Sequence, residues 1–353
     1  MLRLPRNAQI WFPAYLQSRL SSLSRPAPAR LWVTITDHYE PLWRGADESL
    51  ARDRVARWVR AWPEIARRHH DQRGHPPKYC FFYPEDEYRP FLLDPLAGLT
   101  EAGVADVEIH IHHDDGPRGA VGRQHFLERM EGFIETLTSR HGLLHRRDGR
   151  MQFGFIHGNW ALDNSRPDGR WCGINDEISL LARLGCYADF TLPSAPHPTQ
   201  ARMVNVIYWA VDDPARPKSY DRGIPLRPGC GREGDLLLIP GPFGLRWAER
   251  FLPRLEGGEL AHYDPPSRYR VVRWMALAPR LGSDCFLKLY THGAQEKNRQ
   301  MLLEGGLDEL FAGLGAVCRE RNCQLYFVSA WQMYLAVEAI RAGGDPVAAV
   351  QKG

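Results

Sequence analysis

The sequence predicts an α/β fold built around a mostly parallel sheet. Short apolar or β-branched segments recur along most of the 353-residue chain, and amphipathic helical patterns fall between several of them. Alternation of strands with helices is typical of βαβ units, whose consecutive strands run parallel. We therefore expect one large domain over residues 31–353, preceded by an N-terminal extension over residues 1–30.

Nine segments have the length and residue content of strands. They are Leu31–Thr36, Lys78–Tyr83, Asp106–Ile111, Met151–Ile156, Ala188–Leu192, Met203–Trp209, Asp235–Ile239, Asp284–Tyr290 and Gln324–Val328. Helical periodicity, with apolar residues near i, i+3 or i+4 and i+7, appears in four segments. These are Glu48–His69, Arg123–His141, Asp176–Leu184 and Lys297–Arg319. The Pro- and Gly-rich stretch near residues 212–234 predicts a loop insertion or a small lid.

Composition excludes several classes of protein. Lys and Arg number 45 against 42 Asp and Glu, and the net charge of +3 gives no bulk attraction for nucleic acid or anionic lipid. No stretch approaches the roughly 20 apolar residues of a transmembrane helix, and polar residues interrupt any secretory signal at the N-terminus. The seven cysteines are scattered and form no CxxC pair or zinc motif. Reduced thiols, and hence a cytoplasmic location, are expected. The oligomeric state stays open.

Polar side chains follow four of the predicted strands. They are Asp37 and His38 after the first strand, His110 and His112 at the end of the third, His157 after the fourth, and His292 after Asp284–Tyr290. Active sites of parallel α/β proteins lie outside the carboxyl ends of their strands. We therefore expect these side chains to meet at one edge of the sheet.

His110 and His112 form the most specific of these patterns. Two residues apart on a strand, they point to the same face and can present two neutral imidazoles to one divalent ion. His113 points to the opposite face and is not expected to be a ligand. Asp114 and Asp115 can supply an oxygen ligand or orient a ligating imidazole.

Asp37 follows a buried strand, and the next helix starts only near Glu48, too far for Asp37 to act as its cap. This position favours a chemical role for the carboxylate. Glu40 is a second carboxylate within reach, but Pro41 places it in a turn, and its role stays open. His292 can be a general acid, a metal ligand or a structural residue.

The loop GFIHGNWALDNS contains His157, Asn159 and Trp160. Gly158 lets the backbone pass close to a ligand. An aromatic ring beside amides suits a sugar, whose apolar face stacks while its hydroxyls form hydrogen bonds. We expect these three residues to contact substrate.

In their order along the chain these segments resemble the motifs of the NodB-type polysaccharide deacetylases, a metal-dependent carbohydrate esterase family. VTITDHYEP is similar to the family's opening strand and its paired acids, with Asp37 at the first acid and His38 at the second. VEIHIHHDD resembles the metal-binding strand, with His112 at the best match. LLARLGCYADFTLPS places Asp189 at a family acid, and CFLKLYTHG places His292 at the family's general acid.

Two family residues are absent. The second metal histidine has no counterpart, so His110 or Asp114 would have to replace it. The arginine of the third motif is missing from HGNWALDNS, where His157 or Asn159 takes its place.

The resemblance implies a distorted (β/α) barrel with seven or eight mostly parallel strands. It also implies a hydrolase that removes N-acetyl or O-acetyl groups from a sugar or polysaccharide precursor. A divalent ion, with zinc as the first expectation, would be held by His38, His110 and His112. Asp37 would be the general base, His292 the general acid, and Asp189 a group that orients a catalytic residue.

Two other functions remain open. A glycoside hydrolase on a similar barrel would use two carboxylates, Asp37 or Glu40 with Asp163, Glu177 or Asp189. A metal-dependent amidohydrolase is a variant within the hydrolases, but no Lys is expected at a strand end to bridge two metals. The other class is a catalytically silent carbohydrate-binding protein.

Overall fold

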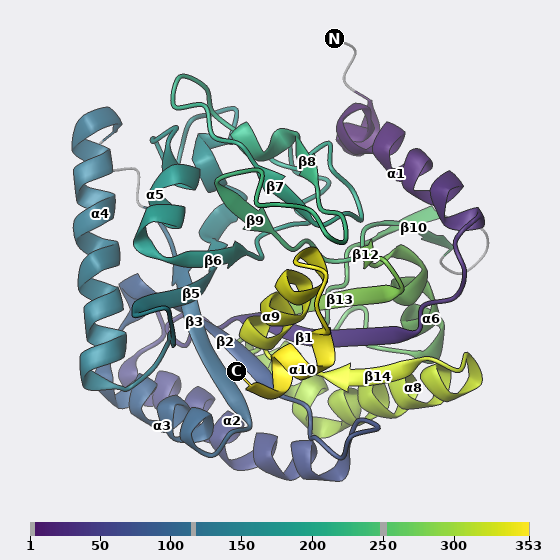
Figure 1. The fold of residues 1–353 in the computed structure, drawn as a ribbon. Helices are drawn as coiled ribbons and strands as arrows, with labels where there is room; N and C mark the ends of the chain where they lie inside the picture. Colours follow the sequence, from purple (N-terminus) through teal and green to yellow (C-terminus); the bar gives the residue numbers. More distant parts are fainter. Residues whose placement is uncertain (1–3, 114–117, 248–252, 353) are drawn as a thin grey trace.

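A computed structural model describes residues 4–113, 118–247 and 253–352, so Asp114 and Asp115 lie outside the described residues (Figure 1). The largest sheet has twelve strands. They are β1 (Arg30–His38), β2 (Tyr79–Pro84), β3 (Ala105–Ile111), β4 (His145–Arg147), β5 (Arg150–His157), β6 (Cys186–Asp189), β7 (Tyr208–Ala210), β8 (Gly223–Pro225), β9 (Leu236–Leu238), β12 (Arg280–Leu281), β13 (Asp284–Thr291) and β14 (Gln324–Phe327). A separate hairpin pairs β10 (Gly244–Trp247) with β11 (Pro253–Glu256).

The main sheet has the order β12-β13-β1-β2-β3-β5-β6-β9-β7-β8, with β14 on β1 and β4 on β5. The central pairs from β13 to β9 are parallel, which confirms the α/β fold with a mostly parallel sheet. Each of the nine predicted strands overlaps a strand of the sheet, but Met203–Trp209 does so only at Tyr208 and Trp209, because β7 spans Tyr208–Ala210. Among the described residues no pairing joins β12 to β8, so a closed barrel is not shown.

Strand β13 and the segments that follow β6 and β9 nevertheless approach each other across the sheet. Gly241 follows β9, and a Cβ atom there would lie 2.8 Å from the backbone oxygen of Lys288 on β13. Only glycine permits so close a backbone approach. The Lys288 ammonium also donates a hydrogen bond to the carbonyl oxygen of Phe190, just after β6, at 2.8 Å. The sheet is therefore curved enough to bring β13 and β6 together across its inner face.

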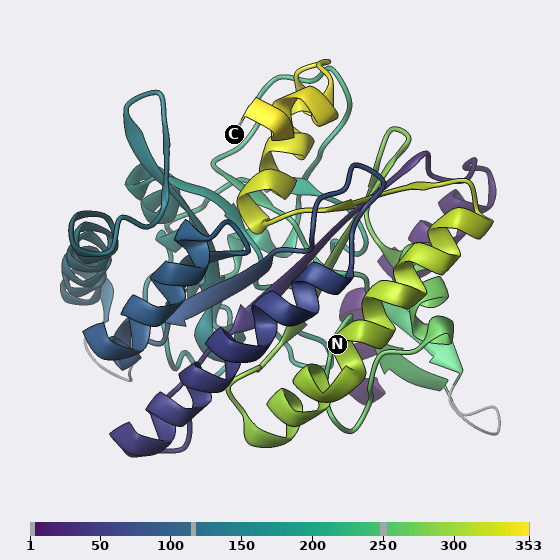
Figure 2. The ribbon, with the colours of Figure 1, turned by 90° about the horizontal axis from the view of Figure 1, so that it is seen from below.

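Ten helices accompany the sheet in the described residues. They are α1 (Ala8–Leu23), α2 (Glu48–Arg68), α3 (Pro90–Glu101), α4 (Gly119–Glu135), α5 (Glu177–Leu184), α6 (Arg268–Leu277), α7 (Glu296–Met301), α8 (Leu307–Glu320), α9 (Ala330–Arg341) and α10 (Pro346–Lys352). Helices α2 to α6 and α8 surround the outer face, with α2 and α8 side by side in Figure 2. Helix α9 lies within the curve of the sheet (Figure 1).

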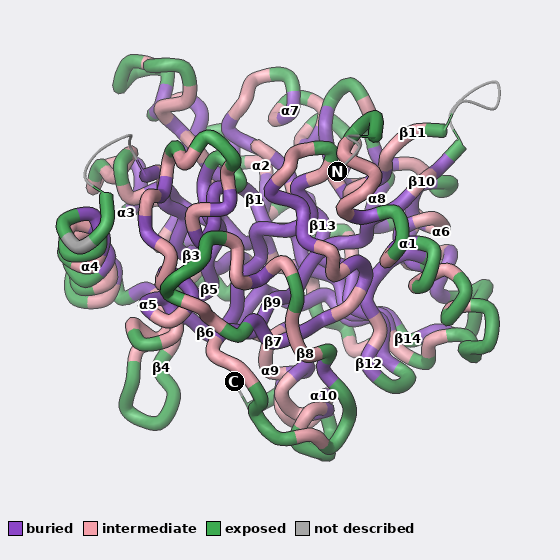
Figure 3. Tube along the Cα trace, turned by 90° about the horizontal axis from the view of Figure 1, so that it is seen from above, coloured by how far each residue is buried: buried purple, intermediate pink, exposed green. Residues whose placement is uncertain are grey.

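Each face of the sheet carries its own apolar core because side chains alternate along a strand. Val33 and Ile35 of β1 and Ile109 of β3 pack on the outer face against the surrounding helices. Trp32 of β1 and Phe82 of β2 pack on the inner face against α9. Figure 3 shows the buried strands enclosed by helices whose outward sides are exposed.

The same alternation continues to the carboxyl ends of the strands. His38 lies an even number of residues after Trp32, so its side chain points to the same inner face. His110 directly follows Ile109, which points to the outer face, so His110 also points to the inner face. Asp37 and His157 are in phase with the outer-face residues. Strand pairing brings these ends together, because Asp37 pairs with Thr291 and Ile111 pairs with His157.

Some predicted elements differ from the structure. The predicted helix Lys297–Arg319 is interrupted at Leu302–Gly306, where Gly305 has a φ of 116°, a value that favours glycine. The N-terminal extension contains α1, whose Trp11 and Tyr15 pack on Phe243. The insertion near residues 212–234 adds β8 to β7 and buries Tyr220, so this segment is part of the packed structure. None of the described helices has the length and hydrophobicity needed to cross a bilayer.

Candidate functional site

A cavity of about 310 Å³ lies at the carboxyl ends of the strands, and we call it the rim cavity. It brings together most of the residues that the sequence singled out. Its lining residues are His38, Glu40, Trp43, His110, His112, His157, Asn159, Trp160, His292 and Gln295. Several histidine side chains from the ends of parallel strands therefore line the rim cavity.

His110 is held with one ring nitrogen facing the cavity. Its Nδ1 lies 2.9 Å from the carbonyl oxygen of Ile156, which can only accept, so Nδ1 carries the proton. In the neutral ring, Nε2 then has a free lone pair. That Nε2 is buried without a hydrogen-bond partner and lies 3.6 Å from Oε1 of Glu40.

His112 is oriented in the same way. Its Nδ1 lies 3.0 Å from Oδ1 of Asp86, and its Nε2 lies 3.5 Å from the same Oε1 of Glu40. A carboxylate that accepts from the distal nitrogen is a common support for a metal-binding histidine. Asp86 and Glu40 outweigh the effect of burial and raise the pKa of His112 to about 10.

Glu40, His110 and His112 therefore form a group with the donor set of a divalent-metal site. Ligand atoms of a tetrahedral zinc site with bonds of about 2.0–2.3 Å lie roughly 3.3–3.8 Å apart. The separations of 3.5 and 3.6 Å in this group agree with that spacing. Burial opposes ionisation of Glu40, but the two imidazoles lower its pKa well below the ordinary value. With its pKa raised, His112 carries a proton on the Nε2 that faces Glu40 when no ion is present, and a bound cation would take the place of that proton.

The residue that completes this group differs from the sequence prediction. Glu40, and not His38, joins His110 and His112. His38 lines the same cavity, with its ring centre 5.2 Å from that of His110 and 4.8 Å from that of His292. Burial and the neighbouring imidazoles lower the pKa of His38 well below its ordinary value, so this ring is neutral at pH 7.

Asp37 occupies the opposite side of the strand and does not line the rim cavity. Its Oδ1 accepts a hydrogen bond from the Gly293 amide at 2.6 Å, and its Oδ2 accepts from the Tyr79 hydroxyl at 2.9 Å. Asp37 is fully buried, and this burial raises its pKa to about 7. The carboxylate therefore fixes the backbone next to His292 and does not face the cavity.

Two variants of Asp37 will distinguish the contribution of its hydrogen bonds to stability from the contribution of its charge. We expect Asp37→Ala to lower the free energy of unfolding by about 2–4 kcal/mol, because the Gly293 amide and Tyr79 hydroxyl lose their buried acceptor. In Asp37→Asn the amide oxygen can accept from the Gly293 amide, and the amide nitrogen can donate to the Tyr79 hydroxyl oxygen. The folded pKa near 7 exceeds the ordinary 3.8, so wild-type stability relative to Asp37→Asn is greatest below pH 3.8 and falls until about pH 7. Urea unfolding of the three proteins at several pH values measures this; a difference that rises with pH would contradict it.

Asp189 supports the end of β5 without lining the cavity. Its carboxylate accepts hydrogen bonds from the amide and hydroxyl of Thr191, and the Thr191 hydroxyl oxygen accepts from the His157 amide at 2.9 Å. Lys288 lies near it on the inner face, and burial lowers the pKa of this lysine to about 7. Asp189 thus orients the strand end that carries His157.

A second cavity of about 650 Å³, the aromatic cavity, adjoins the rim cavity. Trp160, His292 and Gln295 line both. Trp160 is 37% exposed and Tyr263 is 57% exposed, so both rings are accessible. Three polar residues, Glu259, His262 and Asn298, line the same cavity. Apolar surfaces with a few polar groups are typical of small-molecule sites.

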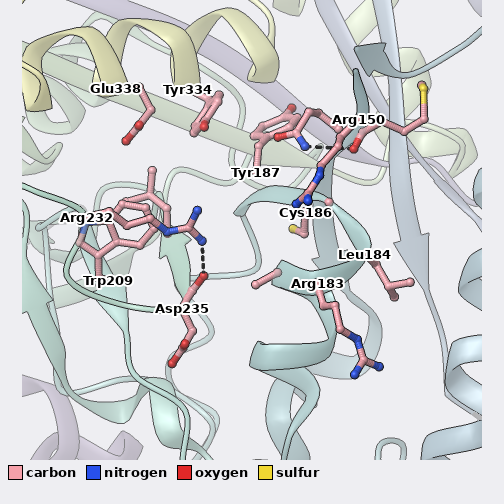
Figure 4. A pocket seen from close by; sticks show the side chains of 15 residues that line it. Arg150, Arg183, Leu184, Cys186, Tyr187, Trp209, Arg232, Asp235, Tyr334 and Glu338 are labelled. Carbon is pink, nitrogen blue, oxygen red and sulfur yellow. Dashed lines mark hydrogen bonds between the residues drawn. The ribbon is translucent and has the colours of Figure 1, made fainter. Parts of the chain in front are cut away.

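A third cavity of about 470 Å³ lies at the opposite end of the sheet, at the amino ends of β5, β6 and β9 (Figure 4). Arg150 and Arg183 contribute cationic groups, and the Arg232 guanidinium lies 5.1 Å from the ring centre of Trp209. Its residues include no group of potential metal ligands among those described. The rim cavity is therefore the stronger candidate for catalysis.

No protein-family model matches the chain, and no curated protein matches it significantly. Function is therefore inferred from the geometry of the site.

The sequence left the role of Glu40 open because Pro41 indicated a turn, and it did not place Glu40 with His110 and His112. In the structure a turn begins at Pro41, and Oε1 of Glu40 lies 3.6 Å from Nε2 of His110 and 3.5 Å from Nε2 of His112. The sequence also gave no reason to group Cys172 with histidines, since no second cysteine lies at a metal-binding spacing. In the structure Cys172 lies with His113, His157 and Glu177, and all four are buried.

Proposed function

We propose that this chain is a metal-dependent hydrolase that removes acetyl groups from a sugar or polysaccharide precursor. The observation that carries the proposal is the convergence of His110 Nε2 and His112 Nε2 on Glu40 beside an open cavity. Three protein ligands next to solvent-accessible space are typical of catalytic zinc sites, which keep one position for water or substrate.

Glu40, His110 and His112 would hold the ion. When bound, a divalent ion such as zinc polarises an acyl carbonyl and makes water more acidic. His38 is neutral and lines the cavity, so it can accept the proton of water, although its lowered pKa makes it a weaker base than an ordinary histidine. His292, whose ring lies beside His38, can give a proton to the leaving amine or hydroxyl. Asp37 holds the Gly293 backbone in place and so acts here as a positioning residue, in place of the general base implied by the resemblance.

A sugar substrate is supported by the aromatic cavity. The exposed rings of Trp160 and Tyr263 can stack on the apolar face of a sugar, while Asn298 and His262 can bond its hydroxyls. Because Trp160 and His292 line both cavities, a sugar in the aromatic cavity can place an acetyl group in the rim cavity.

The carboxylates favour this function over a glycoside hydrolase. Glu40 is the one carboxylate among the described residues that line the rim cavity. Asp163, Glu177 and Asp189, the partners that a two-carboxylate mechanism would require, do not line it.

Acetate release from N-acetylated and O-acetylated oligosaccharides tests the proposal. We expect zinc-loaded protein to release acetate, chelator-treated protein to lose this activity, and His292→Ala to retain less than about a hundredth of kcat, the usual range for a general acid. His75→Ala serves as the matched control, because His75 is exposed and distant from the rim in the described structure. Metal-independent release of reducing sugar would favour the glycosidase, and sugar binding without any turnover would favour the silent binder.

A further inference from the structure

A second group of metal-ligand side chains lies on the outer face of the sheet, and we call it the buried cluster. It consists of His113, His157, Cys172 and Glu177, whose ligand atoms all lie within 4.8 Å of one another. His113 follows β3, His157 ends β5, Cys172 lies in the loop after β5, and Glu177 is the first residue of α5. Four segments of the chain therefore meet at this point.

The contacts centre on the Glu177 carboxylate. Its Oε1 lies 3.0 Å from Nε2 of His113 and 3.3 Å from Nε2 of His157. Its Oε2 lies 3.5 Å from Sγ of Cys172. The distances from Glu177 to His157 and to Cys172 match the roughly 3.3–3.8 Å between ligands of a tetrahedral zinc ion, and the distance from Glu177 to His113 is slightly shorter.

One polar atom in the cluster has no partner. Nδ1 of His157 lies 2.6 Å from the carbonyl oxygen of Gly158 and so carries the proton. Nε2 of His157 then holds a lone pair, is fully buried, and makes no hydrogen bond. It faces the Glu177 carboxylate, which is also an acceptor. Two acceptors at this distance require a cation between them, either a bound proton or a metal ion.

The donor set and its enclosure indicate which ion fits. One thiolate, two imidazoles and one carboxylate are ligands that zinc accepts in proteins. The exposed fractions are 9% or less for all four residues, and there are four protein ligands. The rim group has three ligands beside a cavity. Structural zinc sites are four-coordinate and closed, whereas catalytic sites keep an open position.

An ion here would hold the loop that carries Trp160. Residues 158–176 include five non-glycine residues with positive φ, namely Asn159, Trp160, Asp163, Asn164 and Trp171. Such backbone conformations persist only where surrounding contacts fix them. Glu177 Oε2 accepts a hydrogen bond from the Asp163 amide at 2.6 Å, and His157 begins the loop.

We propose that the buried cluster is a structural zinc site that fixes the loop 158–176 beside the rim cavity. The proposal does not rest on the proposed hydrolase function, because the rim group contributes no ligand to it. Binding replaces the proton of the Cys172 thiol, which passes to solvent, by a sulfur–metal bond.

Cobalt substitution tests this site on the intact chain. Co²⁺ bound to a thiolate gives a charge-transfer absorption band in the near ultraviolet, and the rim group has no sulfur to produce one. We expect metal-free wild-type protein to develop this band when Co²⁺ is added and to lose it when zinc is added. Cys172→Ser should lack the band, and Cys186→Ser should keep it, since Cys186 is equally buried but lies at the start of β6.

The possible results separate the two proposals. Glu40→Gln should keep the band, so a failed rim site leaves this test intact. His113→Asn, which keeps the thiol, should weaken Co²⁺ affinity at the cluster at least about tenfold and covers the case in which Cys172→Ser does not fold. No band in the wild type, or an unchanged band in Cys172→Ser or His113→Asn, would overturn the proposal.

Discussion

Replacing Glu40 with glutamine or His110 with alanine will lower the rate of acetyl release at least about 10³-fold. Each change removes a ligand from the rim group, and an ion in such a site contributes several kcal/mol of charge stabilisation. Both side chains face the cavity or its wall, so we expect the chain to remain folded. Steady-state kinetics with a saturating acetylated oligosaccharide, together with thermal unfolding of each variant, measure the two effects.

A graded variant strengthens this test. Asp86 contacts only the distal nitrogen of His112, and its side chain is 42% exposed. Asp86→Ala should therefore weaken zinc affinity by about 10–100-fold and leave activity recoverable at high zinc. Full activity in Glu40→Gln, or equal losses in Asp86→Ala and the exposed control His75→Ala, would show that this group does not hold a catalytic ion.

The second large effect concerns stability. Glu177→Ala will lower the free energy of unfolding by about 3–5 kcal/mol, because it leaves the His113 ring and the Asp163 amide without their buried acceptor. Although burial disfavours the charge of Glu177, the two imidazoles lower its pKa, so the carboxylate is ionised across the neutral range. Denaturant unfolding of chelator-treated protein measures the loss independently of any metal.

Glu296 provides a matched control for this variant. It is likewise the first residue of a helix, α7, and it pairs with Arg54 at 2.6 Å, but its side chain is 44% exposed. The Arg54 side chain is buried, but after this change its guanidinium still donates to the carbonyl oxygens of Pro41 and Trp43, at 2.7 and 3.1 Å. Glu296→Ala should therefore have a small effect. Similar losses in both variants would mean that the buried cluster does not hold the 158–176 loop.

The sequence was sufficient for the elements that depend on local pattern. Strands such as β1 and β13 are mostly apolar segments, and their carboxyl ends bring His38 and His292 to the rim cavity as expected, whereas Asp37 lies on the opposite side of β1. Helix α3 was missed, because Pro90 and Pro95 resemble breakers even though Pro90 occupies the first turn, where proline is tolerated. Antiparallel additions such as β12 are only two residues long and leave no periodicity to detect.

The site was less predictable because it depends on which face each side chain occupies. Alternation along β3 predicted that His113 points to the face opposite His110 and His112. The expectation that His113 is not a ligand took account only of potential ligands on the inner face. On the outer face it meets His157, which has the same phase, and Glu177, which is 64 residues away in sequence. Contacts of that kind depend on how α5 packs against β6 and β9, and the sequence pattern does not specify this packing.

Metal content of the purified chain tests the central claim most directly. After incubation with excess zinc and removal of free ion, we expect mass spectrometry to find one ion per chain fewer in His112→Ala than in wild-type protein. The buried cluster should keep its own ion in both proteins. Equal zinc in wild type and His112→Ala, or no zinc in either, would contradict the assignment of the rim group as a metal centre.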